Sequence, residues 1–317
     1  MTAPLRPYNS TLQPQLRTVF SMSHPTIRGS LVALITPFNE DGSVNFDKLG
    51  ELIDFHLANS TDALVILGTT GESSTMSHEE DNAVCEYTVK RVAGRIPVIA
   101  GSGSNSTQTM LEKSLSYERL GADGLLLITP YYNKTNEEGM YLHFKTVADA
   151  VKIPCILYNV PGRTGCSISV ANVARLSQHP NIVGIKEASG NMSYAAKVAK
   201  YLSDDFAMYS GNDDMIVPLL SIGASGVISV LANIAPKETH QMVFDYLEGR
   251  TDDARHAQIE LLDVINDLFI EVNPVPVKEA MNLLGMDVGG YRLPLTHMTE
   301  AHRETLRSSL AAAGFLK

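Results

Sequence analysis

The sequence predicts an α/β protein with a (β/α)8 TIM barrel and a C-terminal helical appendage, and three observations lead to this fold class. Eight short apolar segments recur from residue 30 onward, each nearly continuous, as expected for strands buried on both faces of a parallel sheet. Segments with helical spacing of apolar residues separate them. After residue 250 only amphipathic helical patterns follow. This regular alternation favours a barrel over segregated α+β architectures.

The expected strands are spaced so that each pair leaves room for one helix. In chain order they are LVALI from residue 31, ALVIL from 63, IPVIA from 96, GLLLI from 124, IPCILY from 153, NIVGIK from 181, FAMYS from 206 and GVISV from 226. The alternative is an open doubly wound sheet. Against it, the turn "GSGSN" at 101–105 lacks the G-x-G-x-x-G spacing of a dinucleotide-binding turn.

Helix signals occur between these strands. The segment "NFDKLGELIDFHLA" has apolar residues at helical spacing, and Ser77 with Glu80 forms a capping-box pattern at the start of the next helix. Residues 106–120 and 137–151 show similar patterns. Beyond the barrel, three further helices are expected at "DDARHAQIELLDVINDLF", "VKEAMNLLG" and "TEAHRETLRSSLAAAG". We expect these C-terminal helices to form packing or oligomer surfaces and assign them no chemistry.

Three regions follow from these patterns: an extension at 1–28, a catalytic barrel at 29–249 and a helical region at 250–317. The extension contains three arginines, four prolines and no acidic residue, with little helical periodicity. Such a segment is typical of a transit peptide, and plastid targeting is one interpretation. A true start at Met22, or a disordered or non-native extension, is equally compatible with the pattern.

Composition narrows the class of protein and its partners. A formal charge of -10, from 35 acidic and 25 basic residues, opposes binding to nucleic acids and anionic membranes. No apolar run approaches the ~20 residues that span a bilayer. The three cysteines, Cys85, Cys155 and Cys166, form no C-x-x-C pair and no disulfide framework, which indicates a reducing compartment and a cytoplasmic location.

Candidate catalytic residues follow the expected strands, where the active site of a (β/α)8 barrel lies. Lys186 ends an apolar segment, although burying a charge costs several kcal/mol unless the charge is paired, neutralised or used. Each candidate alone has a structural explanation, such as an ion pair between Lys186 and Glu187. Together they indicate a reaction centre: Thr69, Thr70, Tyr131, Tyr132, Tyr158, Arg163 and Lys186.

Covalent catalysis by Lys186 is the chemistry that this set supports best. Desolvation drives an amine toward its neutral, nucleophilic form, and enzymes lower the pKa of such lysines to ~7–8. The reaction partner would be a ketone. Tyr158 is expected to move protons with relay through Thr69, while backbone N–H groups of "GTTG" at 68–71 would hold a carboxylate.

Competing chemistries have less support. The nine histidines are scattered, without an H-x-H or H-E-x-x-H pattern, so we expect no metal. The turn "SGNDD" at 210–214 is acidic where many phosphate-binding barrels have glycines and amide donors, which argues against a phosphorylated substrate. The sequence indicates no organic cofactor.

Five motifs, "GTTGES", "TPYYN", "YNVPGRTG", "GIKEASG" and "NPVPVKEA", occur in this order. In them, and from about Gly29 to the C-terminus, the chain resembles the dihydrodipicolinate synthase family. This family belongs to the pyruvate-dependent class I aldolases, as do N-acetylneuraminate lyases and 2-keto-3-deoxy sugar acid aldolases. The resemblance implies a lyase of lysine and diaminopimelate biosynthesis that condenses pyruvate with L-aspartate 4-semialdehyde to 4-hydroxy-tetrahydrodipicolinate.

The resemblance also implies a role for each site residue. Lys186 would form the Schiff base with pyruvate, and Thr69, Tyr158 and Tyr132 would relay protons, with Tyr132 supplied by a neighbouring subunit of a homotetramer built from tight dimers. The matching substrate-binding positions are Thr70, Arg163, Gly211 and Ile228.

Arg163 would bind the carboxylate of aspartate semialdehyde, for which a bidentate guanidinium is well suited. A polyhydroxylated sugar aldehyde offers the guanidinium no carboxylate, which disfavours the sugar-aldolase activities. They remain the alternative within the superfamily. A non-catalytic keto-acid sensor on the same barrel is the alternative from a different class.

The resemblance further implies an effector site for L-lysine at the tight-dimer interface. Its matching positions are Ser73, Ser74, His78, Asp81, Asn105, Thr109 and Tyr131. Two of them depart from the lysine-sensitive pattern: Asp81 replaces a histidine, and Thr109 replaces the glutamate that pairs with the α-ammonium. Glu112 would compensate only in part, and Asp81 offers an alternative partner for the ε-ammonium. We therefore expect weak or absent inhibition by L-lysine.

Overall fold

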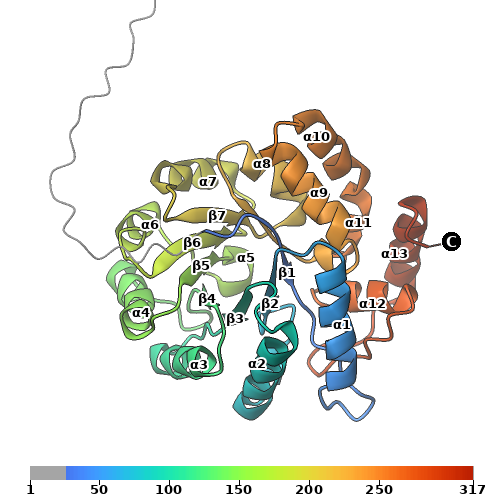
Figure 1. Cartoon of the computed structure of the whole chain (residues 1–317), viewed down its shortest axis with the longest axis horizontal. Helices are drawn as coiled ribbons and strands as arrows, with labels where there is room; N and C mark the ends of the chain where they lie inside the picture. Colours follow the sequence, from blue (N-terminus) through green and yellow to red (C-terminus); the bar gives the residue numbers. More distant parts are fainter. Residues whose placement is uncertain (1–25, 317) are drawn as a thin grey trace, which may run out of the picture.

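The computed structural model describes residues 26–316 and contains a closed barrel of eight parallel strands in which β1 also pairs with β8 (Figure 1). The predicted (β/α)8 fold is confirmed, with a strand that overlaps each of the eight expected segments. The strands are β1 Gly29–Ala33, β2 Ala63–Ile66, β3 Val98–Gly101, β4 Gly124–Ile128, β5 Cys155–Asn159, β6 Ile182–Glu187, β7 Ala207–Ser210 and β8 Gly226–Ser229. Residues 1–25 of the predicted extension lie outside the described residues.

Helices alternate with the strands and surround them. They are α1 Phe46–Ala58, α2 His78–Val92, α3 Thr107–Arg119, α4 Glu137–Ala150, α5 Pro161–Thr164, α6 Val170–Leu176, α7 Met192–Val198, α8 Ile216–Leu220 and α9 Pro236–Leu247. The predicted capping box starts α2: Glu80 N donates to Ser77 Oγ at 3.2 Å, and Ser77 N donates to Glu80 Oε2 at 2.9 Å. Local sequence therefore fixes where this helix begins.

Two apolar clusters hold the barrel together. One fills its interior with side chains that alternate along the strands, including Leu31, Val65, Ile99 and Ile228. The other lies between the strands and the surrounding helices. Because both faces of each strand are buried, the strand sequences are nearly continuous apolar runs. The interior is thus a packed core, and functional side chains are left for the strand ends.

The C-terminal region contains α10 Thr251–Glu260, α11 Leu262–Asp267, α12 Val275–Leu283 and α13 Glu300–Ala312, which lie together at one side of the barrel (Figure 1). The single helix predicted over 252–269 is wrong, because Leu261 caps the end of α10 and the start of α11. Leu261 adopts φ -89° and ψ -1°, outside ideal α geometry, and no glycine or proline marks this interruption.

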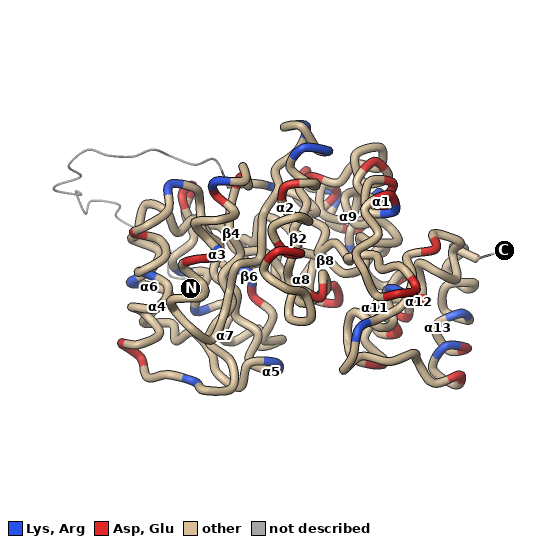
Figure 2. Tube along the Cα trace, turned by 90° about the horizontal axis from the view of Figure 1, so that it is seen from below, with Lys and Arg blue, Asp and Glu red and all other residues tan. Residues whose placement is uncertain are grey.

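Charged residues of both signs are interspersed on the outer helices, as on α13 (Figure 2). On that helix Arg303 and Arg307 face Glu300 and Glu304 one turn away. Among residues 26–316, no helix is both long and apolar enough to span a bilayer.

Candidate active site

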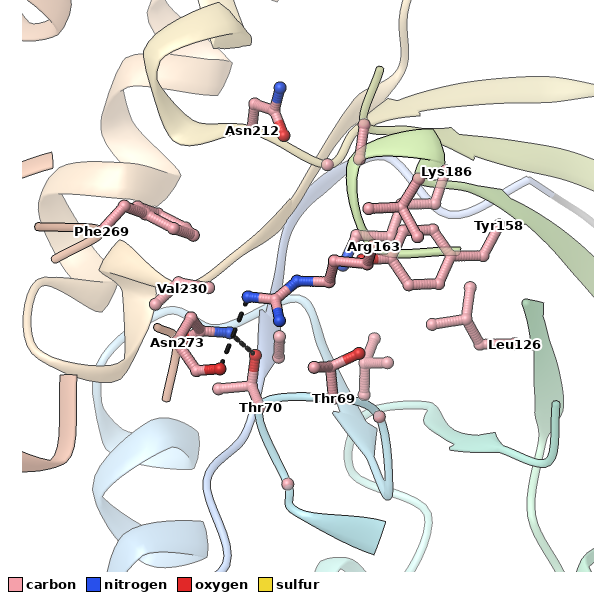
Figure 3. Close-up of a pocket in the computed structure, with 17 residues that line it drawn as sticks. Thr69, Thr70, Leu126, Tyr158, Arg163, Lys186, Asn212, Val230, Phe269 and Asn273 are labelled. Atoms are coloured by element: carbon pink, nitrogen blue, oxygen red, sulfur yellow. Dashed lines mark hydrogen bonds between the residues drawn. The ribbon is translucent and has the colours of Figure 1, made fainter. Parts of the chain in front are cut away.

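Lys186 lies near the C-terminal end of β6, where the sequence predicted a reaction centre. Its side chain is 6% exposed, and it pairs in register with Tyr158 on β5. The Nζ atom lies 4.4 Å from the centroid of the Tyr158 ring, and Figure 3 shows both residues at the same cavity. The buried amine thus stands beside a phenol.

The alternative ion pair between Lys186 and Glu187 is not present. Consecutive strand residues point to opposite faces, and the Glu187 carboxylate turns away from the cavity. It accepts hydrogen bonds from Asn159 Nδ2 and Ser189 N, both at 2.8 Å. Glu187 therefore anchors neighbouring loops and leaves Lys186 without this partner.

Burial controls the protonation of Lys186. The pKa of its amine is lowered to about 8: desolvation by burial has the largest effect, Asp213 opposes it, and the positive charge of Arg163 adds to it. Asp213 is itself buried in the loop after β7, where its Oδ2 accepts hydrogen bonds from Val230 N and Leu231 N at 3.0 Å. A useful fraction of neutral amine is therefore available near neutral pH.

Tyr158 keeps its proton in this environment. Burial raises the pKa of its phenol to about 12, although Arg163 and a hydrogen bond with the Thr69 side chain oppose this shift. The phenol is only 8% exposed and belongs to the apolar interior of the barrel. Tyr158 can consequently donate a proton beside Lys186, and Thr69 is close enough to connect it to further groups.

Asn273 joins two predicted substrate-binding residues. Its Nδ2 donates to Thr70 Oγ1 at 2.9 Å, and its backbone carbonyl accepts a hydrogen bond from Arg163 at 3.4 Å (Figure 3). Both Asn273 and Phe269 line the cavity, although they belong to the C-terminal region. This corrects our expectation that the C-terminal region only packs; the motif "NPVPVKEA" contained the missed asparagine.

Of the two remaining predicted substrate-binding residues, Gly211 lines the Lys186 cavity and Ile228 does not. Gly211 lines the cavity, and a Cβ atom there would lie 3.0 Å from Lys186 Cε and 2.5 Å from Ala188 Cβ. A glycine is therefore needed for the lysine to lie where it does. Ile228 is fully buried inside the barrel and is not among the cavity-lining residues, which include Val230 instead.

The two tyrosines of "TPYYN" do not reach Lys186 within one chain. Tyr132 is 92% exposed, adopts φ 68° and is not among the residues that line the Lys186 cavity. Tyr131 is 39% exposed and lines a second, larger cavity that shares Thr69, Tyr158 and Arg163 with the first.

The second cavity brings together most of the predicted effector positions. It is lined by six of the seven residues, while Asn105 is the exception and accepts a hydrogen bond from Asn133 Nδ2 at 2.9 Å through its carbonyl. Asp81 is not free, because its Oδ2 pairs with Lys113 Nζ at 2.9 Å and accepts from Ser73 Oγ at 3.0 Å. One oxygen of the carboxylate that would attract a ligand ammonium is thus already paired with Lys113, a partner that sequence reasoning missed.

The fold and the site define a (β/α)8-barrel protein with a buried, electrostatically perturbed lysine on its sixth strand. A model of the dihydrodipicolinate synthetase family matches residues 26–313, and the chain belongs to this family. A 4-hydroxy-tetrahydrodipicolinate synthase of Acetivibrio thermocellus is 52% identical over 93% of this chain and 100% of its own length. The 4-hydroxy-tetrahydrodipicolinate synthase of Caldicellulosiruptor saccharolyticus is 55% identical over 92% of this chain and 98% of its own length.

Solved structures agree with this assignment. The crystal structure of dihydrodipicolinate synthase from Aquifex aeolicus has a TM-score of 0.88 and 46% identity, covering 90% of this chain and 97% of that one. The lysine-bound dihydrodipicolinate synthase of Cyanidioschyzon merolae has a TM-score of 0.89 and 39% identity. The match covers 92% of this chain and 99% of that one.

Proposed function

We propose that this protein is a 4-hydroxy-tetrahydrodipicolinate synthase of the lysine and diaminopimelate pathway, which condenses pyruvate with L-aspartate 4-semialdehyde. Family membership supports the activity, and one geometric observation carries it: a buried lysine with a pKa of about 8 stands 4.4 Å from the ring of a protonated tyrosine. The iminium ion formed between Lys186 and pyruvate supplies the electron sink, so the proposed reaction uses neither a metal nor an organic cofactor.

The reaction begins with covalent capture. Neutral Lys186 Nζ attacks the ketone carbon of pyruvate to form a carbinolamine. Loss of water, with a proton delivered through Tyr158, leaves an iminium ion. Removal of a methyl proton gives an enamine, whose carbon attacks the aldehyde of the second substrate. The substrate amino group then closes the ring on the former ketone carbon and releases Lys186, which restores the free enzyme.

Two anion-binding elements orient the substrates. Residues 68–71 line the cavity beside Lys186, and the Thr70 hydroxyl with backbone N–H groups of this turn would bind the pyruvate carboxylate. Arg163 is exposed at the cavity and connects both cavities, which suits the carboxylate of aspartate semialdehyde. This guanidinium is the feature that favours aspartate semialdehyde over the polyhydroxylated aldehydes of sialic acid and keto-deoxy sugar lyases.

The proton relay is completed by a second copy of the chain. Tyr132 is 92% exposed and is held on a loop next to the second cavity, a position suited to entering a partner's site. A homotetramer made of two tight dimers would bury it there. Free cysteines fit a reducing cytoplasm; plastid import through residues 1–28 remains the alternative.

Borohydride trapping tests this function. With pyruvate and borohydride, the protein should acquire one reduced adduct on the peptide that contains Lys186, as measured by mass spectrometry. Wild-type enzyme should then consume aspartate semialdehyde in a substrate panel. An adduct on another lysine would refute the mechanism; efficient cleavage of N-acetylneuraminate or keto-deoxygluconate would favour a sugar-acid lyase, and an adduct without turnover would indicate a sensor.

A further inference from the structure

A fully buried ion pair lies directly behind the loop that carries Thr69 and Thr70. Lys278 Nζ on α12 donates to Glu72 Oε1 at 2.8 Å, and the two side chains are 0% and 1% exposed. Glu72 follows Gly71 in the motif "GTTGES". The pair thus connects the C-terminal region to the end of the proposed carboxylate site.

The surroundings of Lys278 satisfy its charge within the protein. Its Nζ also donates to the Gly290 carbonyl at 2.6 Å and lies 4.2 Å from the centroid of the Phe38 ring. Arg292 stacks over the same ring at 4.4 Å and forms an ion pair with Glu80. Phe38 follows β1 and Glu72 follows β2, so both lie at the same end of the barrel. Through them, Lys278 connects the C-terminal region to the loops after these two strands.

The loop between β2 and α2 has an unusual backbone at this point. Glu72 adopts φ 54°, in the left-handed region that favours glycine, and its N–H donates to the Thr69 carbonyl at 3.1 Å. Thr36 Oγ1 holds the Gly71 carbonyl at 2.7 Å. A non-glycine residue persists in this conformation only where its surroundings hold it, and the carboxylate contact with Lys278 does so here.

Helix α12 and the residues just before it therefore contact the loop that carries Thr69 and Thr70 at two points. Asn273, just before the helix, donates to Thr70 Oγ1 at 2.9 Å, and Lys278 within it holds Glu72. A buried ion pair is often no more stabilising than apolar residues of similar volume, so stability alone is a weak reason for its presence. Because the ion pair lies beside the loop that carries Thr69 and Thr70, it can instead hold the backbone of that loop in place.

We infer that Glu72 and Lys278 are positioning residues that, with Asn273, set where Thr69 and Thr70 lie, so that helix α12 fixes the pyruvate carboxylate site. This inference rests on the proposed function, because it concerns how pyruvate is bound. Neither residue touches the substrate; each acts through the backbone of residues 69–72.

Steady-state kinetics with separate titration of the two substrates tests the inference. Glu72→Asp keeps both charges but shortens the side chain by one methylene, which shifts the loop. We expect the KM for pyruvate to rise about tenfold, because small misplacements of a binding group are costly, with the KM for aspartate semialdehyde nearly unchanged. Glu72→Gln/Lys278→Met removes both charges together, so it should retain a Tm near that of wild type and show the same selective rise in KM.

Arg303→Gln provides the matched control. Arg303 Nε donates to Oε1 of Glu279, the neighbour of Lys278 on α12, at 2.6 Å, but this pair joins α12 to α13 and not to the threonine loop. The Arg303→Gln variant should lose some stability and keep the wild-type KM for pyruvate. An unchanged KM in Glu72→Asp, or equal changes for both substrates that follow the loss in Tm, would overturn the inference. Absence of a wild-type borohydride adduct would instead refute the proposed function.

Discussion

The cavity at Lys186 and the adjoining second cavity differ in how much of each a single chain supplies. Around Lys186 the candidate functional side chains are buried and line one cavity: Lys186, Tyr158 and Thr70 are 6%, 8% and 4% exposed. At the second cavity Tyr131 and Tyr132 are 39% and 92% exposed. If the proposed function is right, one chain supplies the groups for Schiff-base formation, whereas the role proposed for Tyr132 and the effector contacts require a second chain.

Removal of the amine should have the largest effect. Lys186→Ala leaves no nucleophile in the buried cavity, so turnover should fall at least about a thousandfold and the borohydride adduct should disappear. Glu72→Gln/Lys278→Met also removes a buried lysine ammonium, yet it should still form the adduct at saturating pyruvate. Retention of an adduct in Lys186→Ala would show that another lysine is the nucleophile.

Mixed oligomers test whether the relay crosses between chains. Tyr132→Phe should reduce turnover about a hundredfold, as expected for loss of a proton-transfer group. Lys186→Ala is also inactive, but its Tyr132 is intact. Mixing the two variants under conditions that exchange subunits should restore activity, because a hybrid dimer contains one site with both groups. No recovery despite verified exchange, or a fully active monomer by light scattering, would contradict the shared site.

Arg163→Ala should separate the two substrates. A charge-assisted hydrogen bond contributes about 1.5–3 kcal/mol net, so kcat/KM for aspartate semialdehyde should fall at least about tenfold. The Schiff base with pyruvate should still form, because Thr70 and Lys186 remain. Arg175→Ala is a suitable control, since Arg175 pairs with Glu138 at the surface and does not line the cavity. An equal loss of pyruvate trapping would contradict this division of roles.

The pH dependence should report the buried amine. Burial places the pKa of Lys186 at about 8, so kcat/KM for pyruvate should rise about tenfold per pH unit below pH 8 and level off above it. The phenol of Tyr158, with a pKa of about 12, does not titrate in this range. A rise that continues to pH 10 would show an unperturbed lysine.

A variant of Asp213 tests whether the inflection in the pH profile belongs to the Lys186 amine. The carboxylate of Asp213 raises the pKa of Lys186 against the effect of burial, so Asp213→Asn should move the inflection to lower pH. Asp214→Asn, which changes an exposed neighbour, should leave the inflection in place.

Sequence alone predicted several of the residues that meet at the Lys186 cavity, because a barrel brings strand ends together. Lys186 and Tyr158 needed only the strand assignment and the rule that active sites lie at the C-terminal ends. Asn273 and Lys278 were missed because their partners Thr70 and Glu72 are 203 and 206 positions away, and no local pattern encodes such contacts. Lys113 was missed for the same reason: its pairing with Asp81 requires α2 and α3 to pack side by side.

The smallest effect is expected from adding L-lysine, because Asp81, the carboxylate that lines the second cavity, is already paired through Oδ2. Asp81 is occupied by Lys113 at 2.9 Å, and the Lys113 ammonium adds a repulsive charge. Thr109 is neutral, and Glu112 accepts a hydrogen bond from Gln108 on the exposed side of α3 at 2.7 Å. Loss of one paired carboxylate costs about 1.5–3 kcal/mol, or about ten- to a hundredfold in affinity.

We therefore expect little inhibition of the wild type at millimolar L-lysine in a steady-state assay. Thr109→Glu restores a carboxylate within the cavity and should make the enzyme measurably more sensitive, whereas Gln108→Glu adds the same charge at an exposed position that does not line the cavity. Half-inhibition of the wild type well below millimolar L-lysine would show that the cavity binds the ligand despite the Asp81–Lys113 pair. Equal sensitivity of the two glutamate variants would show that the added charge acts through the general field of the protein.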